Sequence, residues 1–89
     1  MPRVIFTSNL QRHIQCAESR VTAGTVGAAL AQVFAAQPKA RGYVLDEQGH
    51  LRKHVVVFVD GRRVLDREHL SDSLDESSDV YVMQALTGG

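Results

Sequence analysis

One stretch with helical periodicity, in a chain otherwise patterned for strands, most constrains how this protein can fold. Its apolar side chains recur at helical spacing through residues 26–37: Val26, Ala29, Leu30, Val33 and Phe34. Thr25 can cap the start of this helix through its hydroxyl, and Pro38 closes the regular part. Because one helix covers only one face of a sheet, the opposite face must stay partly open, and apolar residues there indicate a partner surface.

Strand patterns lie on both sides of this helix. Residues 3–8 are rich in β-branched and aromatic types, and a second strand is expected over about 13–19. After the helix we expect a short strand at 43–45, a turn at 46–49 and a return strand that begins at Leu51. This return strand continues into the densest apolar run, residues 55–59.

Three glycines have expected conformational roles. Asp60 and Gly61 predict a two-residue hairpin turn, in which both positions need positive φ, followed by a returning segment at 62–65. Gly42 suits a left-handed exit after a short turn that follows the helix. Gly27 lowers helix stability, and its small size would let the helix approach the sheet closely.

The last strand is expected at 79–85. Alternation places Val80 and Val82 on one side and Tyr81 and Met83 on the other. The acidic, serine-rich segment 66–78 that precedes this strand is expected to be irregular, with Leu70 and Leu74 holding it to the core.

The sequence ends in Leu86, Thr87, Gly88 and Gly89. Glycine has no side chain, so such an end can enter a narrow channel and present the carboxylate of Gly89. The five residues 85–89, fully extended, span about 17 Å at roughly 3.4 Å each, enough to reach another protein's active site. A frayed tail is the alternative interpretation. We therefore divide the chain into one domain, 1–85, and a flexible tail, 86–89.

Charge and composition narrow the class of partner. Ten Lys and Arg balance ten Asp and Glu among 89 residues, so net charge favours neither nucleic acid nor an anionic membrane. The acidic stretch 66–79 is interpreted as a solvated loop, in preference to a surface that faces a basic groove of a partner. Cys16 is the only cysteine, which excludes an intrachain disulfide. With no signal-like start and no apolar run near 18 residues, we expect a soluble, cytoplasmic protein, monomeric when free.

A conventional active site is hard to find. His50 and His54 flank a predicted strand, about 13 Å apart, and are interpreted as solvated rather than as metal ligands. Cys16 has no predicted helix N-terminus beside it that would lower its pKa, so a semi-buried strand residue is favoured. The pairs at 52–53 and 62–63, all Lys or Arg, are assigned to two turns as ordinary surface charge. We expect no metal, no stably bound cofactor and no catalysis by the chain itself.

The remaining reactive group is the carboxylate of Gly89. A carboxylate resists nucleophiles because its oxide is a poor leaving group, whereas joining it to AMP supplies a good one. A sulfur nucleophile can then form a thiocarboxylate. The ATP site and the sulfur source would belong to a partner.

The order of elements, the segment 55–64 (Val-Val-Val-Phe-Val-Asp-Gly-Arg-Arg-Val) and the ending 79–89 (Asp-Val-Tyr-Val-Met-Gln-Ala-Leu-Thr-Gly-Gly) resemble the ThiS/MoaD sulfur carriers. That resemblance implies an α+β, ubiquitin-like β-grasp fold, a mixed sheet crossed by one main helix, with the first and last strands parallel at its centre. It also implies that an E1-like adenylating enzyme activates Gly89, using ATP and a sulfur donor. The thiocarboxylate then passes its sulfur to a synthase.

Three alternatives stay open: a molybdopterin-synthase-type small subunit, a ubiquitin-like modifier that forms isopeptide bonds through Gly89, and a β-grasp interaction module with an inert tail. The residues 84–89 are closest to the tail of thiamine-type carriers, whereas the hairpin at 45–54 looks like that of longer members, including the cysteine-biosynthesis carrier. The metabolite that receives sulfur is therefore open. Met83, Tyr81 and Phe58 are the candidate docking residues on the open face, and the face of Phe58 depends on strand register.

Overall fold

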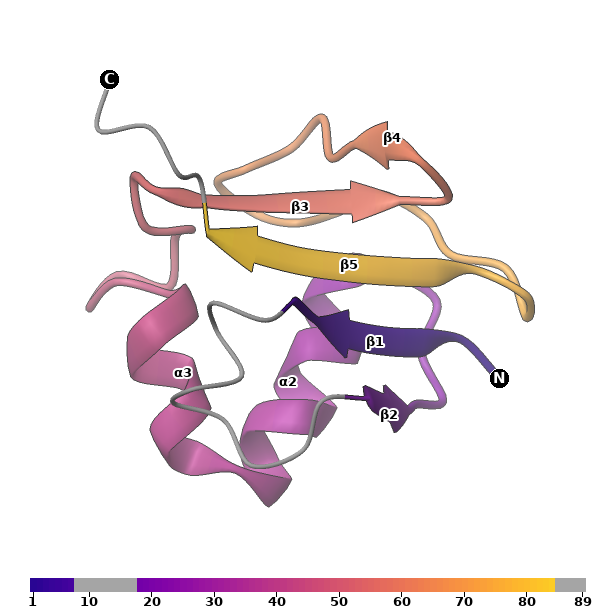
Figure 1. The fold of residues 1–89 in the computed structure, drawn as a ribbon, viewed down its shortest axis with the longest axis horizontal. Helices are drawn as coiled ribbons and strands as arrows, with labels where there is room; N and C mark the ends of the chain where they lie inside the picture. Colours follow the sequence, from indigo (N-terminus) through magenta and orange to yellow (C-terminus); the bar gives the residue numbers. More distant parts are fainter. Residues whose placement is uncertain (8–17, 85–89) are drawn as a thin grey trace.

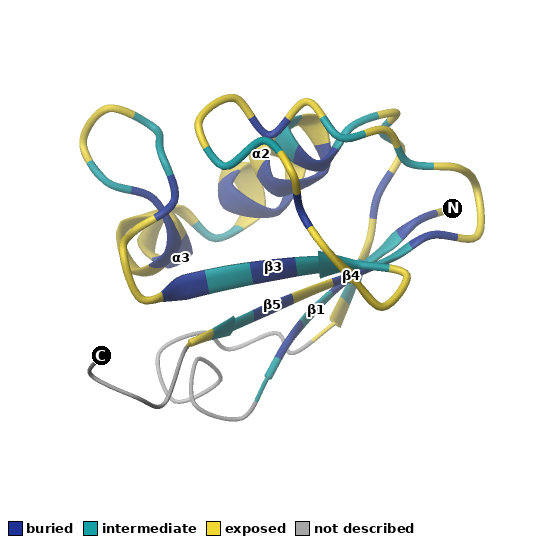
Figure 2. Cartoon of the chain, turned by 90° about the horizontal axis from the view of Figure 1, so that it is seen from above, coloured by how far each residue is buried: buried dark blue, intermediate teal, exposed yellow. Residues whose placement is uncertain are grey.

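The computed structural model describes residues 1–7 and 18–84 of the chain. These residues form a five-stranded sheet in the order β2-β1-β5-β3-β4, and both helices lie on one side of it (Figures 1 and 2). The strands are β1 (Arg3–Phe6), β2 (Glu18–Arg20), β3 (Val55–Val59), β4 (Arg62–Arg63) and β5 (Asp79–Gln84). The helices are α2 (Val26–Ala36) and α3 (Pro38–Val44). The α+β class and the mixed sheet are confirmed.

At the centre of the sheet, the first strand β1 pairs with the last strand β5. Strand β5 pairs in parallel with β1, with Val4 opposite Val80, and antiparallel with β3, with Val57 opposite Val82. All four of these side chains are fully buried beneath the helices. The predicted parallel pairing of first and last strands and the inward direction of Val80 and Val82 are therefore correct.

Helix α2 provides most of the helical side of the core. It begins after Thr25, whose Oγ1 accepts the Ala28 N–H at 3.2 Å, as the capping prediction requires. Its buried side chains are those of the predicted stripe: Val26, Ala29, Leu30, Val33 and Phe34. These side chains pack in the same core cluster as Val4 and Phe6 of the first strand. Burial of this stripe fixes which face of the sheet is covered.

Helix α3 corrects the sequence-based assignment of residues 38–45. Pro38 starts a second helix at its first position, where a missing N–H costs nothing and a fixed φ is favourable. Gly42 lies inside this helix and has no left-handed conformation, and Val44 ends the helix instead of forming a strand. The predicted return strand from Leu51 is also wrong, because Leu51 forms only an isolated bridge with Leu45 before a turn leads into β3.

The two predicted turns have the expected backbone. Asp60 and Gly61 connect β3 to β4 with φ of 50° and 84°. In the 46–49 turn, Gly49 has φ of 84° and its N–H donates to the Asp46 carbonyl at 3.1 Å. Strand β4 ends at Arg63, earlier than the predicted 62–65, although the Val64 N–H still donates to Val57 at 2.8 Å.

The segment 66–78 is bound to the start of α2. The N–H groups of Val26 and Gly27 donate to the carbonyls of Asp72 and Leu70, at 3.0 and 2.8 Å. Leu70 is buried and Leu74 packs against the core, as predicted. The predicted reason for Gly27 was wrong: a Cβ there would lie 3.2 Å from the Leu70 carbonyl oxygen, so the close approach is to this segment and not to the sheet.

Most of the predicted second strand lies outside the described residues, including Cys16. The described part, β2, pairs antiparallel with β1 at the sheet edge. Among the described residues, no helix combines the length and apolar character needed to cross a membrane.

Candidate functional site

The face of the sheet away from the helices carries an apolar patch, which we call the outer patch: Ile5, Val56, Phe58, Tyr81 and Met83. Strand register creates it. Ile5, Tyr81 and Phe58 lie side by side across β1, β5 and β3, and Met83 lies opposite Val56. Directly opposed residues point to the same face, so these five side chains share one surface.

Each residue of the outer patch is partly exposed, and Tyr81 is the most exposed of them at 37%. Their neighbours along the strands, Val57, Val80 and Val82, are completely buried. Side chains along these strands therefore alternate between the buried face and the partly exposed face of the sheet. A partner can reach the outer patch without any rearrangement of the core.

The structure brings together the three docking candidates from the sequence. Tyr81 and Met83 share the outer face, and Phe58 joins them because it pairs directly with Tyr81. Sequence reasoning missed Ile5 and Val56. The alternation of β1 and of the apolar run 55–59 contained the signal, but only the register with β5 shows which residues of each alternation face outward.

The outer patch lies toward the C-terminal end of β5. Gln84 is the last described residue and pairs with Val55 at the start of β3. The tail residues predicted to react or to enter a channel (Leu86, Thr87, Gly88 and Gly89) lie outside the described residues. The outer patch is therefore centred on β5, the strand that leads directly to the tail residues proposed to react.

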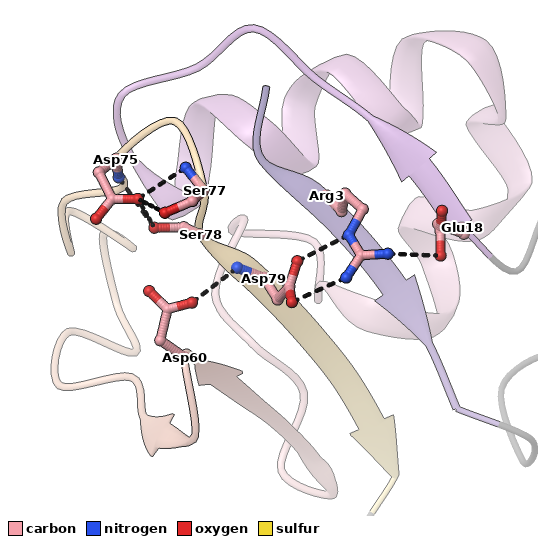
Figure 3. A network of polar contacts seen from close by, with 7 residues as sticks. All are labelled: Arg3, Glu18, Asp60, Asp75, Ser77, Ser78 and Asp79. Atoms are coloured by element: carbon pink, nitrogen blue, oxygen red, sulfur yellow. Dashed lines mark hydrogen bonds and ion pairs between the residues drawn. The ribbon is translucent and has the colours of Figure 1, made fainter.

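Charged side chains occupy the opposite end of the same face (Figure 3). The Arg3 guanidinium donates through Nε and Nη2 to the two carboxylate oxygens of Asp79, at 2.8 and 2.9 Å, and through Nη1 to Glu18 at 3.5 Å. The hydrogen bond from Arg3 lowers the pKa of Asp79, and the same bond raises the pKa of Arg3. These contacts of Arg3 link β1 to both β2 and β5, and they help to hold β1 and β5 in their parallel register.

A second polar cluster positions the start of β5 (Figure 3). Asp60 in the hairpin turn accepts the Asp79 N–H at 2.9 Å. Ser78 is buried, and its hydroxyl accepts the Asp75 N–H at 2.9 Å and donates to the Asp75 carboxylate at 3.2 Å. The N–H and hydroxyl of Ser77, together with Ser78, stabilise the Asp75 carboxylate and lower its pKa. β5 therefore begins from a rigid turn.

The described residues contain no cluster of three or more His, Cys, Asp or Glu side chains placed to hold a metal. His54 is exposed in the turn just before β3, and His50 is partly exposed; no strand separates them, because Leu51 forms only an isolated bridge with Leu45. Within the described part of the chain, every buried side-chain nitrogen and oxygen has a hydrogen-bond partner. The arrangement of the described residues suits binding by a surface.

No protein-family model matches the sequence, and no curated protein matches it. Solved structures do match. SAMP1 from Haloferax volcanii is 21% identical with a TM-score of 0.83, and the match covers 99% of this chain and 98% of that one. A chain of the Amycolatopsis orientalis BexX/CysO complex is 17% identical with a TM-score of 0.83, covering 100% of both chains.

Urm1 from Sulfolobus solfataricus is 16% identical with a TM-score of 0.72, and the match covers 93% of this chain and 99% of that one. At these identities the likeness shows the fold. It extends over almost the whole of each chain, and it confirms the resemblance to ThiS/MoaD-type proteins at that level. The chain has the ubiquitin-like β-grasp fold.

Proposed function

We propose that this protein is a sulfur carrier, a protein co-substrate whose terminal Gly89 is adenylated by an E1-like enzyme and converted to a thiocarboxylate. The observation that carries the proposal is the position of the outer patch. It flanks the central strand β5 near its C-terminal end, while the charged side chains at the start of that strand pair with one another. A partner docked on the patch holds the end of β5 beside its own surface.

The proposed chemistry starts from the carboxylate of Gly89. Its oxygen attacks the α-phosphate of ATP and releases pyrophosphate, leaving an acyl-adenylate. Hydrosulfide or an equivalent sulfur nucleophile then attacks the acyl carbon, AMP leaves with the bonding electron pair, and a thiocarboxylate remains. The partner enzyme provides the ATP site and the sulfur donor. A sulfur-accepting synthase consumes the thiocarboxylate, and we assign these reactions to the cytoplasm, where ATP is supplied.

A second candidate is a ubiquitin-like modifier whose Gly89 forms an isopeptide bond with lysines of other proteins. The similarity to a protein named as a modifier, the small archaeal modifier protein 1 of Haloferax volcanii, supports this candidate. A small subunit docked on a synthase is the related alternative, and BexX/CysO is a complex that contains this fold. Both alternatives use an activated Gly89, as the carrier does. They differ from the carrier in the molecule that reacts with the activated Gly89.

ATP–pyrophosphate exchange with the adenylating enzyme of the source organism tests the proposal. The wild-type chain should support exchange. A chain extended by one residue beyond Gly89, or one with Gly88→Phe, should not, because a narrow channel rejects a side chain or a displaced carboxylate. Both variants should unfold at the wild-type temperature, since we expect the tail to contribute little to the core. Normal exchange by the extended chain would remove the carrier proposal and leave an interaction module with an inert tail.

A further inference from the structure

Strand β2 forms one edge of the sheet. It is the end strand of the order β2-β1-β5-β3-β4, and among the described residues it pairs only with β1 (Figure 1). Its two charged residues, Glu18 and Arg20, are exposed, whereas Ser19 between them is partly buried. Within residues 1–7 and 18–84, no strand lies on the outer side of β2.

The backbone of β2 directs hydrogen-bonding groups toward this edge. Just after the strand, the Val21 N–H donates to the Pro2 carbonyl at 2.9 Å, so the backbone groups of Val21 point toward β1. N–H and C=O directions alternate along an antiparallel strand, so those of Arg20 and Glu18 point away from β1. The Arg3 N–H, directly opposite Arg20, accordingly donates to the β5 side. An edge strand of this kind is a template for strand addition.

The side chains of Glu18 and Arg20 point to the outer face of the sheet. Glu18 lies opposite Ile5, a residue of the outer patch, and Arg20 lies opposite Arg3. The Glu18 carboxylate is 3.5 Å from the Arg3 guanidinium (Figure 3). All ten Asp and Glu residues lie in the described part, and none of them forms an ion pair with Arg20. Arg20 is therefore an exposed cation at the edge with no ion-pair partner among these carboxylates.

The order of the charges limits what can pair with this edge. Charged side chains on an edge strand usually discourage pairing with other chains. An antiparallel strand avoids opposing like charges only if it places a basic side chain opposite Glu18 and an acidic one opposite Arg20. Such a strand reads acidic, any residue, basic along its own direction. The sequence Glu18-Ser19-Arg20 has this order itself.

Two copies of β2 meet the requirement in one register. When they run antiparallel about Ser19, Glu18 of each copy lies opposite Arg20 of the other, and the outward backbone groups of these two residues face each other as a hydrogen-bonded pair. A register centred on Glu18 or on Arg20 opposes like charges, and so does parallel pairing in register. The contact of Glu18 with Arg3 does not prevent this, because a carboxylate has about four acceptor sites.

We propose that two copies of this chain associate through their β2 strands, antiparallel and centred on Ser19, to form one continuous sheet. The contact is isologous, because a two-fold axis relates the copies and each supplies the same residues. Directly opposed residues share a face, so both outer patches lie on one side of the joined sheet and the helices of both copies lie on the other. The inference does not depend on the carrier function.

The association should be weak. A contact through one three-residue strand is small beside the roughly 1,200–2,000 Å² that stable complexes bury. The chain should therefore be monomeric when dilute, as the sequence predicts, and dimeric only at high concentration. Because β1 lies between β2 and β5, the dimer leaves the centre of each outer patch open to a partner.

Sedimentation equilibrium of the full chain, up to millimolar concentration, tests the pairing. The wild-type chain should form dimers at the upper end of this range, and high NaCl should weaken them. Arg20→Glu places carboxylates opposite each other in both halves of the contact, so its dimer dissociation constant should rise by at least about tenfold. Glu18→Arg should have the same effect through opposed guanidinium groups.

A mixture of the two variants separates pairing from other effects of charge. In the proposed register the charges of Arg20→Glu complement those of Glu18→Arg, so the mixture should form heterodimers although neither variant dimerises alone. Arg63→Glu is the matched control, an exposed arginine on the outer face of the other edge strand. Its dissociation constant should stay within about twofold of wild type. Thermal unfolding establishes that each variant is folded.

Four outcomes would overturn the inference. They are a wild-type chain that is monomeric at every concentration, wild-type dimerisation by Arg20→Glu, an equal loss in Arg63→Glu, and a mixture of folded variants that stays monomeric. An equal loss in Arg63→Glu would attribute the association to net charge, and a monomeric mixture would exclude the register. Pyrophosphate exchange measures the carrier function separately, so none of these outcomes affects it.

Discussion

At the scale of single residues, two glycines that lie in helices differ in how much room a side chain would have. A Cβ at Gly27 would lie 3.2 and 3.3 Å from the Leu70 and His69 carbonyl oxygens, whereas a Cβ at Gly42 meets nothing within 4 Å. Alanine in a helix interior is worth about 0.5–1 kcal/mol over glycine. We therefore expect Gly42→Ala to raise the free energy of unfolding by about that amount and Gly27→Ala to give no gain or a loss. Urea denaturation of both variants tests this, and equal gains would disprove the close contact.

Asp66 makes a residue-scale prediction about pH. The Ser71 hydroxyl, then the His69 N–H, hold the pKa of Asp66 at about 2, below its ordinary 3.8. Because the folded pKa is the lower one, this carboxylate stabilises the fold above pH 3.8, and the contribution is lost as pH falls toward 2. The stability difference between wild type and Asp66→Ala should shrink over that window. Ser71→Ala should raise the pKa of Asp66 in an NMR titration, and an unchanged pKa would contradict the assignment.

At the scale of elements, α2 and the outer face of the sheet should separate stability from binding. Phe34 is buried in α2, and truncation of a buried Phe to Ala typically costs about 3–5 kcal/mol. A domain of this size has about 4–13 kcal/mol in total. Phe34→Ala should therefore be much less stable, while its folded fraction is still adenylated normally.

Met83→Asp is the complementary variant on the outer face. Met83 is only partly buried, so its replacement should weaken partner binding by more free energy than it removes from folding. Calorimetry gives the change in binding free energy for each variant, and thermal unfolding gives the change in folding stability. Equal losses for Met83→Asp would make it a core residue, and a stable Phe34→Ala that fails to bind would move the interface to the helix.

The elements also show where sequence reasoning worked and where it failed. α2 was predictable because its buried stripe repeats at helical spacing and Thr25 caps it. α3 is not predicted from the sequence because Pro38 and Gly42 are typical of helix ends, although Pro38 occupies the first turn of α3. The buried pair Ala40 and Val44, four residues apart, was the available signal for a helix.

At the scale of the whole molecule, the β-grasp order could be predicted only through the resemblance of residues 55–64 and 79–89 to the ThiS/MoaD carriers, because alternation along each strand does not fix which strands pair. The docking face could be predicted only in part. Alternation places Tyr81 and Met83 together, but adding Ile5 and Val56 requires the register of strands far apart in sequence.

Whether Gly89 carries activated sulfur can be read from the intact mass of the protein isolated from its own cells. The carrier function predicts a fraction heavier by one sulfur-for-oxygen exchange, located by fragmentation at Gly89, which disappears when the gene for the adenylating enzyme is deleted. A single unmodified mass in both strains, from cells that are using the pathway, would contradict the account. So would a mass gain that fragmentation locates anywhere other than Gly89.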